Sequence, residues 1–134
     1  WGLVMVFFER EMYRNPDQDL NTLWWDYVEK FQLIHRPQGR HAPDWAAKIH
    51  LAHSPVYYQN YLYGQMVASQ LTHYIRQNVG NGKLFNNKDL GPYLIDRYFK
   101  LGSKYDWHKT LELATKEPLN LDYYLCESMG IGKL

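Results

Sequence analysis

Side chains that bond oxygen are concentrated between positions 48 and 61 of the chain. Lys48 and His50 lie two residues apart, and Tyr58 and Tyr61 follow three residues apart on a stretch with helical periodicity. Residues three apart on a helix share a face, so the two phenols are expected to point the same way. Ammonium and phenol groups donate hydrogen bonds to oxygen without having to titrate, which suits a terminal carboxylate or a carbonyl oxygen that gains charge. The structural alternative is that the tyrosine rings pack against neighbours and turn their hydroxyls to water.

The spacing of two histidines indicates a second possible function, the binding of a metal ion. Of the six histidines, His50 and His53 are separated by two residues, a spacing at which two imidazoles can face one ion. No cysteine, aspartate or glutamate nearby in sequence offers a third ligand, and HExxH, P-loop, dinucleotide-binding and nucleophile-elbow motifs are absent. We therefore expect no metal site in this chain. A helical enzyme that uses His50 and His53 with a metal ion is the weakest of three functional hypotheses.

Apolar residues recur at helical spacing along most of the chain, and proline, glycine or capping residues stand at the breaks. The pattern predicts helices over residues 3–14, 19–34, 56–77, 90–101, 107–116 and 121–129, and a short turn over 45–48. No alternation of period two and no internal repeat is visible. The predicted fold class is all-α, an irregular multi-helix bundle, with residues 1–134 as a single helical subdomain.

The longest periodic stretch, residues 56–77, predicts a narrow buried seam. Its members follow one another at steps of four and three residues: Tyr57, Tyr61, Gly64, Ala68, Leu71 and Ile75. Gly64 and Ala68 are small enough to let another element approach closely. We therefore expect this seam in the core, beside a face that is aromatic and polar.

Composition excludes several classes of partner. The 134 residues include 15 Lys and Arg against 14 Asp and Glu, and these charges are scattered, so nucleic acid and anionic membrane surfaces are not expected partners. No run reaches the roughly 18 apolar residues of a membrane span, and the single cysteine, Cys126, cannot form an internal disulfide. Because the chain starts at an apolar Trp1 without a methionine, we interpret it as a piece of a longer protein.

Several of these residues, taken in order, resemble a known family. The resemblance rests on Trp24-Trp25, Tyr27, Lys30-Phe31-Gln32, a proline-containing loop, Asp44 through Lys48-Ile49-His50, Pro55 and paired tyrosines before a long helix, and Gly102-Ser103 before Trp107. The chain is similar to the C-terminal part of angiotensin-converting-enzyme-like peptidyl-dipeptidases, which are helical zinc metallopeptidases of the HExxH gluzincin group. A more distant likeness is to oligoendopeptidases of the thimet type. The resemblance implies zinc as a cofactor of the full-length parent, with none bound by this fragment, and it favours a periplasmic or secreted location.

The same resemblance implies roles for four residues. Lys48 and Tyr58 would hold the C-terminal carboxylate of a substrate, and His50 would bond its peptide backbone. Tyr61 would be the catalytic residue that steadies the oxyanion formed during hydrolysis. These assignments need one inserted residue between His50 and Tyr58, because the ungapped register puts Tyr57 and Asn60 in place of the two tyrosines.

The leading hypothesis is therefore the C-terminal, substrate-binding portion of a zinc-dependent peptidyl-dipeptidase, inactive when alone. Its partners would be a peptide substrate and the missing N-terminal part of the same chain. The rival hypothesis is a non-catalytic helical module that binds a protein or peptide through its tyrosine-rich helix face, since tyrosine and tryptophan are common interface anchors.

Overall fold

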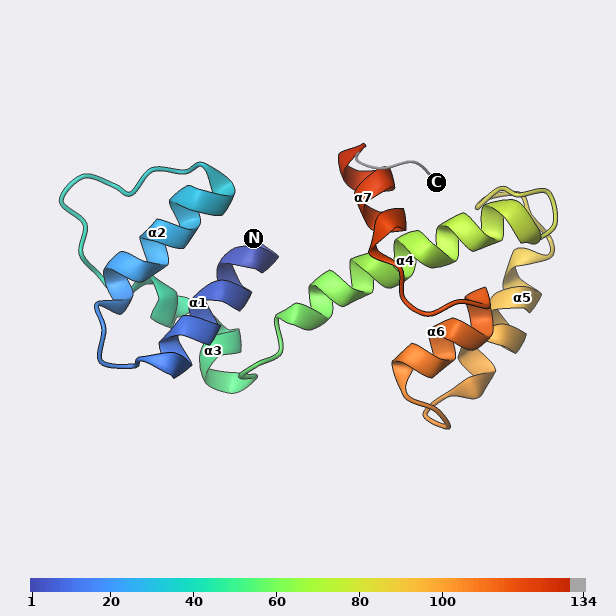
Figure 1. Ribbon diagram of the computed structural model, residues 1–134, viewed down its shortest axis with the longest axis horizontal. Coiled ribbons are helices and arrows are strands. Elements are labelled where there is room, and N and C mark those ends of the chain that lie inside the picture. The colour runs from blue at the N-terminus through green and yellow to red at the C-terminus, as the bar shows by residue number, and fades with distance from the viewer. Residues whose placement is uncertain (131–134) are drawn as a thin grey trace. The chain divides into compact units, whose positions relative to one another are not determined.

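The computed structural model describes residues 1–130, and over these residues it consists of helices, turns and loops without a β-strand. The α-helices, in chain order, are α1 (Gly2–Arg14), α2 (Leu20–Gln32), α3 (Ile49–His53), α4 (Gln59–Asn78), α5 (Leu90–Arg97), α6 (Trp107–Thr115) and α7 (Leu121–Met129) (Figure 1). Two short 3-10 helices, η1 (Asp44–Ala47) and η2 (Phe99–Leu101), complete the described elements. The predicted all-α fold class is confirmed.

The chain divides into two compact units, one over Trp1–Leu62 and a second from Tyr63 onward, whereas the sequence predicts a single subdomain. Each unit takes its buried apolar residues from its own part of the chain. Helical periodicity reveals which face of a helix is buried but not which helix it meets, so this division was not visible in the sequence. Residues 131–134 of the predicted subdomain lie outside the described residues.

Helices α1 and α2 lie side by side and form the core of the first unit (Figure 1). Val4, Met5 and Phe8 of α1 are buried with Trp24 and Val28 of α2. The rings of Phe8 and Trp24 meet edge to face, with centroids 5.1 Å apart. Residues four apart share a helix face, so the apolar spacing of each helix accounts for its contribution to this core.

The start of α2 is fixed by its capping residue, Asp19. The backbone N–H groups of Asn21 and Thr22 donate to Asp19 Oδ1 at 3.1 and 3.0 Å, and the Thr22 hydroxyl donates to Oδ2 at 2.7 Å. These bonds, that of the Thr22 hydroxyl above all, lower the pKa of the Asp19 carboxyl, and His41 adds to the effect. The helix predicted to begin at residue 19 begins at Leu20, with Asp19 as its cap.

Residues 33–43 form an irregular loop, as their prolines and glycine predict. Helix α2 ends at Gln32, two residues before its predicted end, because Leu33 takes a left-handed conformation with φ of 58°. After the loop, the Trp25 indole N–H donates to the Asp44 carboxylate at 3.1 Å. This bond holds η1 against α2. It thereby fixes the position of Lys48, the residue that follows η1.

The connection from η1 to α4 differs from the prediction in two respects. Residues Ile49–His53 form a short helix, α3, that the apolar spacing did not predict. Helix α4 begins at Gln59 and not at residue 56, because Val56 has a left-handed φ of 54° that an α-helix does not contain.

In the second unit, the centre of the packing is a polar residue of α4. Gln70 is fully buried, and its Nε2 donates to the Thr115 hydroxyl at 2.9 Å and to the Pro118 carbonyl at 3.0 Å. Its Oε1 accepts the Asn120 N–H at 2.8 Å. One side chain thus ties α4 to the segment that joins α6 to α7.

The predicted buried seam of α4 is wrong for the first four of its six members. Tyr57 and Tyr61 are exposed, Ala68 is exposed, and a Cβ placed on Gly64 would meet nothing within 4 Å. The buried residues of α4 are Ser69, Gln70 and Ile75, of which only Ile75 belongs to the predicted seam. Gln70 can lie on the buried face because both its amide nitrogen and its amide oxygen are hydrogen-bonded. A pattern of apolar residues does not detect a buried polar side chain of this kind.

Candidate functional site

Four residues predicted to bind substrate or to act in catalysis all lie in the first unit, on a short stretch of chain. Lys48 is the junction between η1 and α3, with an extended backbone, and His50 lies in the first turn of α3. Tyr58 immediately precedes α4, and Tyr61 lies in its first turn. The turn at Val56 reverses the chain between α3 and α4, so residues eight and eleven positions beyond His50 return to it.

His50, Tyr58 and Tyr61 form one cluster, which we call the tyrosine–histidine cluster. The ring centroid of His50 lies 4.9 Å from that of Tyr58 and 5.8 Å from that of Tyr61, and the two tyrosine rings are 5.0 Å apart. His50 Nε2 is 3.2 Å from the Tyr61 hydroxyl oxygen. If Nε2 carries the imidazole proton, it donates to that oxygen and leaves the phenol hydrogen free for another acceptor. Half of the Tyr61 side chain is exposed (50%), so such an acceptor can reach it.

Trp1 also belongs to the cluster, although its place in the sequence does not predict this. The Trp1 indole N–H donates to the Tyr58 hydroxyl at 2.7 Å, and the Trp1 ring packs edge to face against Trp24 with centroids 5.6 Å apart. The hydroxyl of Tyr58 is therefore oriented by a donor that lies 57 residues away in sequence. No local spacing signals a contact of that range, so only the fold reveals it.

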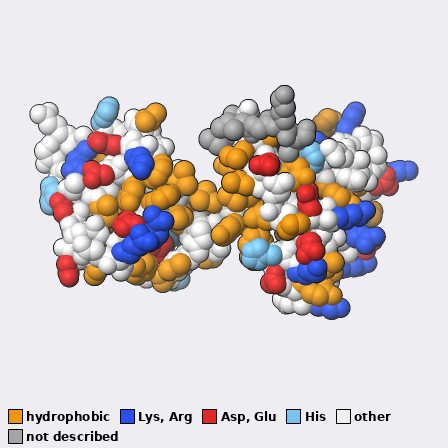
Figure 2. All heavy atoms as spheres, in the orientation of Figure 1, with side chains coloured by type: hydrophobic (Ala, Val, Ile, Leu, Met, Phe, Trp, Pro, Cys, Tyr) orange, Lys and Arg blue, Asp and Glu red, His pale blue; other side chains and the backbone are white. Residues whose placement is uncertain are grey.

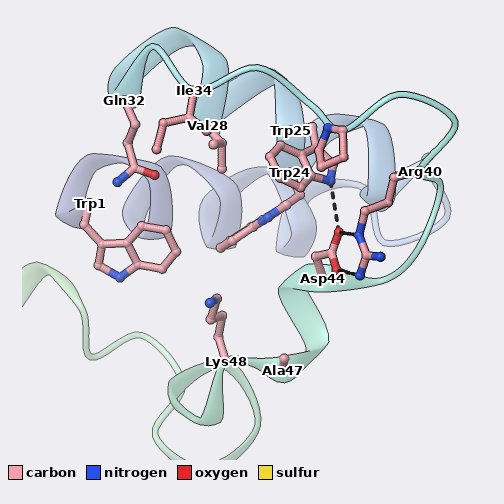
Figure 3. A pocket seen from close by; sticks show the side chains of 11 residues that line it. Trp1, Trp24, Trp25, Val28, Gln32, Ile34, Arg40, Asp44, Ala47 and Lys48 are labelled. Atoms are coloured by element: carbon pink, nitrogen blue, oxygen red, sulfur yellow. Dashed lines mark hydrogen bonds and ion pairs between the residues drawn. The ribbon is translucent and has the colours of Figure 1, made fainter.

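Lys48 points into a cavity of about 450 Å³ beside the cluster (Figure 3). Its ammonium lies 4.9 Å from the Trp1 ring centroid and 5.9 Å from that of Trp24, distances at which a ring face attracts a cation. Trp1 thus contacts both Lys48 and Tyr58, and links the predicted carboxylate-binding lysine to the tyrosine–histidine cluster. The structure gives no direct bond between Lys48 and either tyrosine.

The other charges of this cavity are paired with one another. Arg40 binds both carboxylate oxygens of Asp44, with Nε donating at 2.8 Å, and the pair is drawn in Figure 3. The Arg40 guanidinium holds the pKa of the Asp44 carboxyl below its usual value, with a smaller contribution from the Trp25 N–H. Among the described residues Lys48 has no such ion pair. The cavity therefore offers an anion one uncompensated ammonium between tryptophan walls.

The alternative register of Tyr57 and Asn60 gives a different geometry. The Tyr57 ring lies nearly parallel to that of His50, with centroids 6.5 Å apart, and is 46% exposed. Asn60 is exposed and its backbone N–H donates to the Tyr57 carbonyl in the first turn before α4. The two hydroxyls that contact His50 and Trp1 are those of the gapped register, Tyr61 and Tyr58.

His50 and His53 show no sign of sharing an ion. His50 Nε2 faces the Tyr61 hydroxyl, and His53 Nδ1 lies 3.3 Å from the Ser54 hydroxyl. Over residues 1–130 no group of three or more histidine, cysteine, aspartate or glutamate side chains is placed to hold a metal ion. The residues of this chain that the structure describes do not fit a zinc site.

Comparison with known proteins adds no relative. No family model, no curated protein and no solved structure matches the chain. Within the described part of the chain, no helix combines the length and the apolar character needed to cross a bilayer.

Proposed function

We propose that this chain is the C-terminal, substrate-binding portion of a zinc-dependent peptidyl-dipeptidase that hydrolyses peptides. The observation that carries the proposal is the convergence of His50, Tyr58 and Tyr61, with the Tyr61 hydroxyl 3.2 Å from His50 Nε2 and half of its side chain accessible. In the proposal the zinc ion is held outside this chain, because the described residues do not fit a zinc site. The roles derived below are therefore only those of the chain's own side chains.

Lys48 is proposed to bind the C-terminal carboxylate of the peptide. Its ammonium lies in the tryptophan-walled cavity without an ion pair among the described residues, so a carboxylate there gains a charge-assisted hydrogen bond and displaces no existing partner. Tyr58 supports this end of the site, and the Trp1 N–H that donates to its oxygen leaves its own hydrogen available to an acceptor. A free C-terminus, and not an internal peptide group, is the chemistry that this pair recognises.

Tyr61 is proposed to act on the peptide bond itself. A carbonyl oxygen gains negative charge as water attacks its carbon, and a phenol already aimed at that position stabilises the charge without reorganising. His50 lies against the Tyr61 hydroxyl and limits the directions that its hydrogen can take. His50 is also free to donate to the peptide backbone when its Nε2 turns from Tyr61 to substrate.

The test is the dependence of hydrolysis on the C-terminus of the substrate, measured in the complete zinc-loaded protein. We expect release of C-terminal dipeptides from a peptide with a free carboxylate, and poor cleavage of the same peptide when it ends in an amide. Lys48→Ala should raise KM for the free peptide by at least about tenfold, because a hydrogen bond to a charged group contributes about 1.5–3 kcal/mol. The variant should leave the amide unchanged.

The matched control is Lys30→Ala, which removes another lysine of the first unit that lies over an aromatic ring, that of Phe31. This control should alter neither substrate. A complete protein that hydrolyses no peptide would contradict the proposed function. A Lys48→Ala variant that is equally impaired on free and amidated peptides would contradict the carboxylate assignment alone.

A second candidate, a non-catalytic binding module, is favoured by one observation. Apolar side chains are exposed next to the tyrosine–histidine cluster, among them Ile49 (68%), Val56 (60%) and Tyr57. Figure 2 shows hydrophobic side chains at the surface of the first unit. Stoichiometric binding of an uncleaved peptide to this face, abolished by Ile49→Lys, would support the module over the peptidase.

A further inference from the structure

Helix α1 carries a buried carboxylate that reaches the turn before the tyrosine pair. Glu9 is only 6% exposed, and its Oε1 accepts the backbone N–H of Val56 at 2.5 Å. The two residues are 47 positions apart in sequence. A buried carboxylate is costly unless it is bonded, so this contact has to contribute to holding the two segments together.

Val56 is an unusual residue to find at this turn. Its φ of 54° lies in the left-handed region, which β-branched residues rarely adopt because the side chain crowds the backbone. Such a conformation persists only where the surroundings hold it. Here both polar groups of its backbone are held: Glu9 accepts the N–H, and the Gln59 side-chain amide donates to the carbonyl at 2.7 Å.

The position of this turn decides where the two tyrosine hydroxyls lie. Tyr58 follows Val56 by two residues and Tyr61 by five, and the Tyr61 N–H donates to the Tyr58 carbonyl in the first helical turn. A change in the Val56 dihedral angles rotates this turn as a unit. The contacts of the Tyr61 hydroxyl with His50 and of the Tyr58 hydroxyl with Trp1 would then both be lost.

We propose that Glu9 is a positioning residue: its buried carboxylate locks the left-handed turn at Val56 and thereby sets the hydroxyls of Tyr58 and Tyr61 against Trp1 and His50. Its effect on hydrolysis rests on the proposed function, whereas its effect on the cluster does not. Glu9 itself touches no substrate in this proposal and acts through the backbone of the turn.

The first measurement is made on the present chain by NMR. We expect nuclear Overhauser effects between the ring protons of His50 and Tyr61, whose centroids are 5.8 Å apart. Glu9→Met keeps the length and helix preference of the side chain but removes the acceptor, so these cross-peaks should disappear while the α1 and α2 resonances persist. Glu9→Gln retains an oxygen that accepts the Val56 N–H and should restore them.

Glu11→Met is the matched control, because Glu11 lies on the same helix and pairs only with the neighbouring Arg10 and Arg14 among the described residues. It should leave the His50–Tyr61 cross-peaks unchanged. If Glu9→Met does not fold, Glu9→Asp decides, since it keeps the charge but draws the carboxylate back by one methylene. Cross-peaks of full intensity in Glu9→Met, or in Glu9→Asp where that variant decides, would overturn the proposal.

The second measurement is hydrolysis by the complete protein. Displacement of a catalytic group by about 1 Å can cost about a hundredfold in rate, so Glu9→Met should lower kcat by up to about a hundredfold at little-changed KM, with Glu9→Gln close to wild type. A kcat that is unchanged in Glu9→Met would contradict the catalytic consequence. If the complete protein hydrolyses no peptide while the cross-peaks depend on Glu9, the proposed function fails and the positioning role stands.

Discussion

At the scale of single residues, the Tyr61 hydroxyl is the group whose environment says most about function. It is accessible from solvent, lies against one histidine nitrogen and neighbours a second phenol. A tyrosine that merely packed its ring would turn its hydroxyl to water and would need no such partner. If His50 Nε2 donates to the Tyr61 oxygen, the phenol hydrogen is left for a ligand, as the proposed stabilisation of a developing charge requires.

Tyr61→Phe tests this role because it removes only the hydroxyl and keeps the ring contacts. In the complete protein we expect kcat to fall by about a hundredfold to a thousandfold with KM within a factor of a few, as for the loss of one oxyanion donor. Steady-state kinetics on a peptide with a free C-terminus provide the measurement. Tyr57→Phe, which removes the neighbouring exposed phenol, should leave both constants unchanged.

The reverse outcome, a large effect of Tyr57→Phe and none of Tyr61→Phe, would favour the ungapped register. Equal changes of kcat and KM in Tyr61→Phe would assign the hydroxyl to ground-state binding and not to catalysis.

The sequence predicted Lys48, His50, Tyr58 and Tyr61 as candidates because their chemistry and spacing are local. It did not predict Trp1 or Glu9, whose bonds to Tyr58 and to the Val56 backbone span 57 and 47 residues. A tryptophan just before an amphipathic helix and a glutamate within it look like an ordinary core residue and an ordinary surface residue. The bond of Trp1 to Tyr58 and that of Glu9 to Val56 form only when α1 has packed beside the turn at Val56.

At the scale of elements, helix α2 shows how one capping residue makes the position of a helix predictable and its stability dependent on pH. The Thr22 hydroxyl, its backbone N–H and His41 all favour the ionised form of Asp19, and so its pKa in the folded chain is well below that of a free aspartate. A lowered folded pKa means that this contribution to stability is present above the unfolded pKa, about 4, and is lost as the pH falls below it.

We therefore expect the wild-type chain to be more stable than Asp19→Asn at pH 6, and this difference to shrink steadily between pH 5 and pH 2. Asparagine still caps a helix but does not titrate, so the difference between the two chains isolates the charge of Asp19. Urea unfolding followed by circular dichroism at several pH values gives the midpoints. A difference that is constant over this range would show that the charge of Asp19 does not contribute.

The helices themselves were largely predictable, but their ends were less so. Apolar spacing located α1, α2 and α6 to within about two residues, because each has an amphipathic face and a capping or breaking residue. The start of α4 was placed three residues too early, and α3 was not predicted. Both errors arise from the turn at Val56. Glu9 imposes the left-handed backbone of this residue, and no propensity scale would select a valine for such a turn.

At the scale of the whole molecule, the two units differ in the polar side chains that they bury. The first unit has an aromatic and aliphatic core over which the proposed site is built. The second buries Gln70 completely, together with Thr110 and Thr115. Apolar periodicity misplaced the buried face of α4 in the second unit, because a hydrogen-bonded amide can occupy a core position that the pattern reserves for apolar side chains.

Substitution of Gln70 should therefore destabilise the second unit more than its polar character suggests. Gln70→Leu keeps the volume but leaves the Asn120 N–H, the Pro118 carbonyl and the Thr115 hydroxyl without this partner. A buried polar group left unsatisfied costs about 1–3 kcal/mol. Thr115 keeps its bond to the Leu111 carbonyl, so we expect a net loss of about 3 kcal/mol in the free energy of unfolding, measured in urea.

Gln77→Leu is the matched control, because Gln77 lies on the same helix but is exposed, and it should change the free energy of unfolding by less than about 0.5 kcal/mol. Amide hydrogen exchange locates the effect: faster exchange in α6 and α7 of Gln70→Leu, with α1 and α2 unchanged, is expected if the buried amide serves only its own unit. Equal stabilities of the two variants would mean that the Gln70 bonds contribute nothing beyond the volume of the side chain. A loss confined to Gln70→Leu would instead establish that the second unit depends on its buried polar network for its stability.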